Sequence, residues 1–149
     1  MTLPRKNKRS ERGQALVEFS LISIVFFLLV FGMVDAGRAV WNYNTLAHAT
    51  REGARYAIVH GGDSADPSGP GGDYYTAPDI DSMITQQVEK FGGGLNPSQL
   101  TVQSEWPDGS NISGSHVTVT SQYDFQPIFD FLGLVSFTMT SSSTMLITN

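Results

Sequence analysis

Residues 19–34 read FSLISIVFFLLVFGMV, sixteen residues without a charge. Counted from Ala15, the apolar run is twenty residues long and is interrupted only by Glu18. Twenty helical residues at a rise of 1.5 Å each span about 30 Å, the thickness of the hydrocarbon core of a bilayer. The apolar side chains favour insertion by roughly 4 to 7 kcal/mol, which exceeds the cost of about 3 kcal/mol for one carboxylate at mid-membrane. The sequence therefore predicts a transmembrane helix.

Charge is distributed unevenly around this helix. Residues 1–12 hold five Lys or Arg and one Glu, a balance of +4, and the formal net charge of -5 for the whole chain leaves -9 for the rest. Such an acidic remainder does not favour a nucleic-acid partner. The positive-inside rule keeps residues 1–12 in the cytoplasm and places the chain from about residue 36 outside. We therefore expect a single-pass protein of the inner (plasma) membrane with an extracytoplasmic C-terminal domain.

The chain has 149 residues and no cysteine. This length suits one small domain beyond the helix. Without cysteine, disulfides, thiol nucleophiles and thiolate metal sites are excluded, so packing alone must stabilise the outer domain.

The residues leave three fates open for the inserted helix. A cleavable secretory signal would be cut after Ala36, because Val34 and Ala36 fit the -3 and -1 positions of such a site. A permanent signal anchor is the second fate. The third starts from Glu18, because a charged residue in a membrane helix indicates a function and its own helix offers it no partner.

Gly13 precedes Glu18 by five residues, and the aromatic Phe19 follows. This pattern resembles the processing site of type IV prepilins. The resemblance implies that a membrane aspartyl peptidase, the prepilin peptidase, cuts between Gly13 and Gln14 on the cytoplasmic side. The new α-amine at Gln14 of a neighbouring subunit would then meet Glu18 and supply the missing opposite charge.

Three consecutive blocks extend the likeness over residues 12–57: RGQALVEF, then a Val-Asp pair leading into Gly-Arg, then REGARYA. Together they resemble the TadE-like family, whose members are pseudopilins or minor pilins of the Flp/Tad pilus, used for adherence. The resemblance implies other pilins, pseudopilins and Tad secretion-machine components as partners, and incorporation into the pilus. It also marks the motif residues Asp35, Gly37, Arg38, Arg51, Glu52, Gly53, Ala54 and Arg55.

Residues 35–60 continue the helical pattern. A stripe of mostly small side chains recurs at spacings of four and three, formed by Ala36, Val40, Tyr43, Ala47, Thr50, Ala54 and Ala57. This face would rest either on the protein's own domain or on another subunit. Oppositely charged residues three apart, Asp35 with Arg38 and Glu52 with Arg55, are expected to pair. Gly61-Gly62 is expected to stop the helix.

The remaining sequence predicts an extracytoplasmic domain over residues 61–149. A loop over residues 61–79 holds several aspartates without the spacing of an EF-hand, so no metal site is expected. An amphipathic helix should follow, from Asp79 or Asp81 to Gly92, and then three strands near residues 100–106, 117–123 and 135–147. The predicted fold class is α+β, a long N-terminal transmembrane and amphipathic helix packed on a small antiparallel sheet of about three strands, with one additional short helix.

No catalytic constellation can be named. His48, His60 and His116 stand alone in the sequence, and no glycine-rich phosphate loop follows a strand. The sequon Asn111-Ile112-Ser113 is attributed to chance. We expect no enzymatic activity, cofactor or small-molecule substrate. The expected organisation is a basic cytoplasmic leader (1–13), a transmembrane and extended pilin-like helix (14–60) and an extracytoplasmic α+β domain (61–149). The alternative to a pseudopilin is a secreted or membrane-tethered binding module whose helix is only an anchor or signal.

Overall fold

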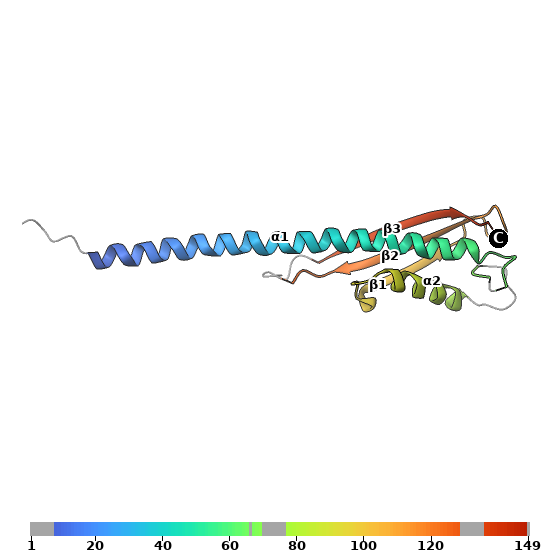
Figure 1. Ribbon diagram of the computed structural model, residues 1–149, viewed down its shortest axis with the longest axis horizontal. Helices are drawn as coiled ribbons and strands as arrows, with labels where there is room; N and C mark the ends of the chain where they lie inside the picture. Colours follow the sequence, from blue (N-terminus) through green and yellow to red (C-terminus); the bar gives the residue numbers. More distant parts are fainter. Residues whose placement is uncertain (1–7, 66, 70–76, 129–135, 149) are drawn as a thin grey trace, which may run out of the picture. The chain divides into compact units, whose positions relative to one another are not determined.

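The computed structural model describes residues 8–65, 67–69, 77–128 and 136–148, with the backbone alone for residues 8–12 and 77–83. The helices are α1 (Lys8–Val59) and α2 (Ala77–Phe91), followed by a short 3-10 helix (Pro97–Gln99). The strands are β1 (Leu100–Glu105), β2 (His116–Phe125) and β3 (Phe137–Leu146) (Figure 1). The predicted α+β fold, with its long N-terminal helix, second short helix and three strands, is confirmed.

The chain divides into two compact units. The N-terminal unit is Met1–Gly37 and the C-terminal unit is Arg38–Asn149. Helix α1 contributes to both units. Its apolar run belongs to the first unit, and the REGARYA block at residues 51–57 belongs to the second.

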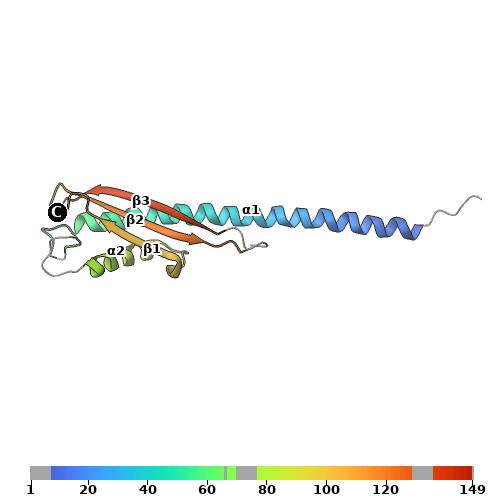
Figure 2. The ribbon, with the colours of Figure 1, turned by 180° about the vertical axis from the view of Figure 1, so that it is seen from behind.

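The sheet is antiparallel, with the strand order β1-β2-β3. Leu100 pairs with Tyr123 across the first ladder, and His116 pairs with Leu146 across the second. Side chains alternate along β2, where the odd-numbered residues are buried and the even-numbered ones are polar and more exposed. Figure 2 shows the strands beside α2 and the second half of α1. One face of the sheet therefore faces the helices and the other faces solvent.

The core of the C-terminal unit lies between the two helices and the sheet. One cluster joins α1, α2 and all three strands or their ends, through Ala49, Ala54, Ala57, Ile84, Val88, Val102, Val117, Val119 and Ile147. A second cluster contains Leu46, Leu95, Tyr123, Phe125 and Met139. Small side chains on α1 allow the helix to approach its neighbours closely, as the stripe of small residues predicted.

The predicted stripe on α1 is buried only in its second half. Thr50, Ala54 and Ala57 are fully buried, whereas Val40 and Tyr43 are 62% and 50% exposed. The interpretation that α1 rests on its own domain is therefore confirmed for the later turns. In the earlier turns, the stripe residues Val40 and Tyr43 remain exposed.

Asn111, the first residue of the sequon, lies inside the fold. The residue is 3% exposed, and its backbone carbonyl accepts a hydrogen bond of 2.8 Å from the Gly62 amide. The Gly69 backbone lies directly against it, since a Cβ at position 69 would be 2.6 Å from the Asn111 Cβ. A glycan at this position would require the loop to open, which agrees with a chance sequon.

Candidate functional site

The apolar run of α1 carries its side chains outward. The large hydrophobic residues from Leu16 to Val34 that are exposed have between 39% and 78% of their surface open. The helix is long and apolar enough to cross a membrane. In a monomer surrounded by water this surface would be highly unfavourable, so a bilayer or other apolar helices must cover it.

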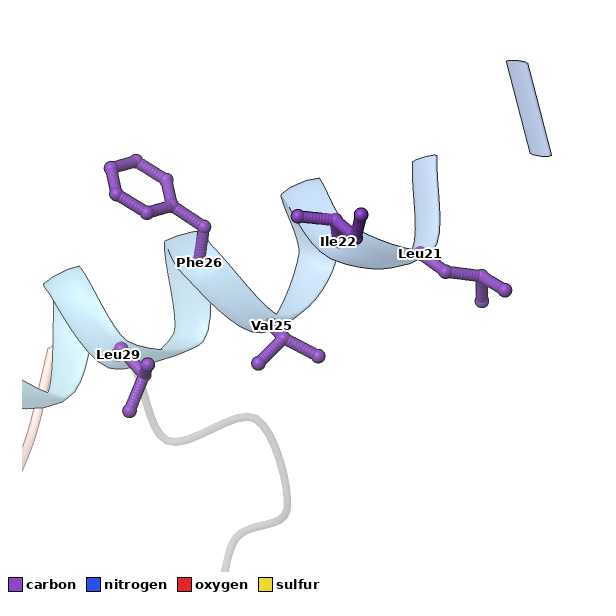
Figure 3. Close-up of a pocket in the computed structure, with 5 residues that line it drawn as sticks. All are labelled: Leu21, Ile22, Val25, Phe26 and Leu29. Carbon is purple, nitrogen blue, oxygen red and sulfur yellow. The ribbon is translucent and has the colours of Figure 1, made fainter. Parts of the chain in front are cut away.

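A shallow apolar groove runs along this part of the helix. It is lined by Leu21, Ile22, Val25, Phe26 and Leu29, whose side chains project from the helix in Figure 3. On the same segment the rings of Phe27 and Phe31 stack at 6.0 Å. The groove contains almost no polar surface, so its chemistry suits acyl chains or an apolar helix.

Glu18 lies exposed among these apolar side chains, and its nearest described partner is one turn earlier. The side-chain amide of Gln14 donates a hydrogen bond of 3.0 Å to Glu18 Oε1. The expectation that its own helix offers Glu18 no partner therefore needs correction, because helical i, i+4 spacing brings the two side chains together. The amide is neutral, however, so it solvates the carboxylate without neutralising it.

Gly13 lies in the helix and is exposed, and no described atom comes within 4 Å of a Cβ placed on it. A glycine in an exposed helix costs about 1 kcal/mol relative to alanine. Packing among the described residues does not explain this cost. Phe19, which follows Glu18, is 68% exposed and contributes to the apolar surface.

The second motif block lies at the junction of the two units. Asp35 is 9% exposed, and Gly37, like Gly13, has open space where a Cβ would be. In the C-terminal unit the Arg38 guanidinium lies over the Phe125 ring at 5.4 Å from its centroid. A cation over an aromatic face at this distance is attractive. Arg38 thereby connects the start of this unit's helix to the end of β2.

The third block divides into exposed charges and buried small residues. Arg51 and Arg55 are exposed, and the predicted pair of Arg55 with Glu52 is present at 3.5 Å. Ala54 is fully buried, and a Cβ on Gly53 would lie 2.6 Å from Val88 Cγ2. The motif identifies Gly53 only as a family residue. Its contact with α2 was missed because the pairing of these two helices cannot be read from either helix alone.

The histidines lie apart from one another. His48 contacts the Phe91 ring at 6.2 Å, and His60 stacks on Tyr56 at 3.9 Å. His116 is beside Asp108, whose Oδ2 accepts hydrogen bonds from the His116 amide (2.7 Å) and Nδ1 (2.8 Å). These bonds, the backbone one first, hold the pKa of the Asp108 carboxyl below its usual value.

The contact between Asp108 and His116 lies in the β1-β2 connection, and both side chains are about half exposed. Among the residues whose side chains are described, no group of three His, Asp or Glu side chains is placed to hold a metal ion. Among the motif residues described, Gly13, Glu18 and Gly37 are exposed and are not explained by packing within the chain.

Residues 13–55 match the family model described as TadE-like protein. The match spans nearly all of the three motif blocks and confirms the resemblance to this family over that segment. No curated protein and no solved structure matches the chain. The family match and the apolar helix together indicate a membrane-anchored, single-pass protein.

Proposed function

We propose that this chain, with its TadE-like segment at residues 13–55, is a pseudopilin or minor pilin that takes part in assembly of a Flp/Tad pilus. In this role the N-terminus is cytoplasmic, the prepilin peptidase removes residues 1–13, and the C-terminal unit lies outside the membrane. The observation that carries the proposal is the placing of Gly13 and Glu18. Both are exposed on the helix, and neither is explained by packing among the described residues.

The mechanism is mechanical rather than catalytic. The apolar helix holds the subunit in the bilayer, and its exposed groove offers a surface to the helices of other pilins. Cleavage would create an α-amine at Gln14, which becomes the first residue of the mature helix. In a medium of low dielectric constant, this amine on one subunit and the Glu18 carboxylate on another would attract strongly enough to set their register.

The Gln14–Glu18 hydrogen bond suggests how the carboxylate is kept in place before that encounter. At 3.0 Å, the amide holds Glu18 Oε1 along the helix while leaving the second carboxylate oxygen for an incoming amine. A carboxylate that accepts a hydrogen bond is also less costly to keep in an apolar environment. Gln14 would thus serve both as the new N-terminus and as an internal partner of Glu18.

The size of the outer domain favours a minor or initiating position over that of the main repeating subunit. About 90 residues follow the helix, which is bulky for every subunit of a thin fibre. Quantitative mass spectrometry of purified pili would test this step. Near-stoichiometric abundance along the fibre would contradict it.

N-terminal sequencing of the protein purified from its native membrane tests the processing step. A mature chain beginning at Gln14 supports the pseudopilin, and Gly13→Leu should abolish that cut because a large side chain replaces the glycine at the cleavage point. Gly37→Ala is the matched control and should be processed normally. A chain beginning at Gly37 would instead indicate a secreted protein, and an uncut chain a plain anchor.

The second candidate function is a membrane-tethered or secreted binding module. The shallow groove lined by Trp41, His48 and Phe91 in the C-terminal unit favours it, since exposed aromatic rings beside polar groups suit ligand contact. Normal pilus assembly in a strain that lacks this chain would favour the module over the pseudopilin.

A further inference from the structure

One end of the C-terminal unit, the end at which Arg38 lies, exposes apolar side chains from three separate segments. Trp41 on α1 is 66% exposed, Phe91 at the end of α2 is 41% exposed, and Phe137 at the start of β3 is 46% exposed. We call this surface the Arg38 end. Scattered single residues of this kind need no explanation, but large apolar side chains that converge from three segments do.

Contacts within the unit place these three segments around the start of its helix. The Phe137 ring lies 5.2 Å from the Phe125 ring, and Phe125 lies under the Arg38 guanidinium. Trp41, one turn after Arg38, lines one shallow groove together with Phe91. Both the end of α2 and the ends of β2 and β3 therefore flank the first turns of α1 in this unit.

The chemistry of the Arg38 end is mixed. The groove places the indole of Trp41 and the ring of Phe91 beside the polar side chains of Asn44, Thr45 and His48. The Lys90 ammonium lies 5.8 Å from the centre of the Phe91 ring. Aromatic rings combined with flexible cations and neutral polar groups are typical of protein surfaces at the headgroup level of a membrane.

The position of Trp41 in the chain identifies the occupant. Trp41 follows Val34, the last residue of the apolar run, by seven residues. Even a fully extended chain of this length reaches only about 25 Å, so Trp41 stays near the bilayer in which the helix is anchored. Phe91 lines the same groove as Trp41, with its ring beside His48, about two helical turns further along α1.

We infer that the Arg38 end of the C-terminal unit rests on the headgroups of the membrane that holds the apolar helix, with Trp41, Phe91 and Phe137 at the interface. The inference depends on membrane anchoring and not on the proposed pilus role. Arg38 and Lys90 are balanced at this end by the exposed carboxylates of Glu89 and Asp124. The contact therefore does not require anionic lipid.

The opposite end of the unit supplies an internal control. His116 and Phe125 are the two ends of β2, and ten strand residues separate positions by about 30 Å. Ile112 precedes His116 by four residues and is 61% exposed. Ile112 thus has the exposure and apolar character of Phe91 but lies far from the Arg38 end.

Because the chain contains no cysteine, single thiols can be introduced and labelled selectively. Phe91→Cys and Ile112→Cys variants of the full chain would each carry an environment-sensitive dye in phosphatidylcholine vesicles. A nitroxide headgroup lipid in both leaflets then quenches dyes near either surface. We expect quenching at position 91 to exceed that at position 112 by about threefold or more, and Trp41→Ser to reduce the difference about twofold.

Equal quenching at the two positions would overturn the inference, and would indicate that the Arg38 end is left for a protein partner. Replacing a quarter of the phosphatidylcholine by phosphatidylglycerol should leave the ratio unchanged. A difference that arises only with the anionic lipid would also overturn the inference, because charge and not the aromatic surface would then hold the unit. Far-UV circular dichroism of each variant confirms that the fold is retained.

Discussion

Gly53 on α1 lies so close to Val88 on α2 that a Cβ at position 53 would be 2.6 Å from Val88 Cγ2. The same Cβ would be 3.4 Å from Ile84 and 3.7 Å from Val119 on β2. A single missing side chain therefore lets two helices and the sheet meet at one point. The glycine of the third motif block has a structural role in the C-terminal unit that is separate from any role in processing.

Gly53→Ala should destabilise the C-terminal unit by about 1 to 3 kcal/mol, because the fully buried Val88 cannot give way without shifting its neighbours. Urea unfolding of the full chain in detergent, followed by circular dichroism, measures the effect. Gly37→Ala is the control in the same helix, since its Cβ meets open space, and it should be neutral or stabilising by up to about 1 kcal/mol. Equal effects of the two substitutions would contradict the packing role.

Glu18→Ala is expected to leave membrane insertion intact and to impair pilus assembly, because it removes the carboxylate that would meet a free amine. Glu18→Gln separates charge from hydrogen bonding, since it still accepts a bond from Gln14 while losing the charge. Counting pili by electron microscopy should give a loss of about tenfold or more for both variants if the ion pair is worth at least 1.4 kcal/mol. Normal piliation with Glu18→Gln would exclude an ion pair.

Asp108 should make the β1-β2 connection sensitive to acid. Its pKa is lowered in the folded protein by the hydrogen bonds from His116, so its contribution to stability is present above the unfolded-state pKa and is lost as the pH falls through the folded-state value, below 3.8. Asp108→Ala should flatten the stability profile in the acid range below the unfolded-state pKa of this aspartate. Thermal unfolding of both proteins across this range provides the measurement, and superimposable profiles would show that the contact adds no stability.

Gly69→Ala should loosen the loop that covers Asn111. A Cβ at this position would be 2.6 Å from the Asn111 Cβ and 2.9 Å from the Trp106 indole nitrogen. In a Trp41→Phe background Trp106 is the remaining tryptophan, so its emission should shift to longer wavelength as water enters. Gly93→Ala, where no described atom lies within 4 Å, should leave the emission unchanged.

Local patterns were sufficient to predict most of the fold. The alternation over residues 117–123 placed β2 correctly because one of its faces is buried and the other is polar. The apolar positions Ile84 and Val88 marked the buried face of α2 for the same reason. Such patterns report burial against some surface, so they identify an element without identifying what it packs against.

The parts that sequence reasoning missed depend on contacts between distant segments. Leu46 and Ala49 are fully buried, yet neither belonged to the predicted heptad stripe, because the buried face of the helix is wider than a heptad seam of two positions. The Gln14–Glu18 bond, by contrast, was within reach of the i, i+4 rule. The processing site itself remains a prediction from the motif and its resemblance.

The solvent-exposed face of the sheet carries hydroxyl pairs whose hydrogen bonds do not depend on pH or salt. Thr118 and Thr144 share a hydrogen bond of 2.8 Å between their hydroxyls, and Thr120 and Ser142 share one of 3.1 Å. Hydroxyl groups neither titrate in the natural pH range nor attract counterions. These cross-strand pairs therefore hold equally well in fresh, salty or mildly acidic water, a property that the proposed location outside the cell would require.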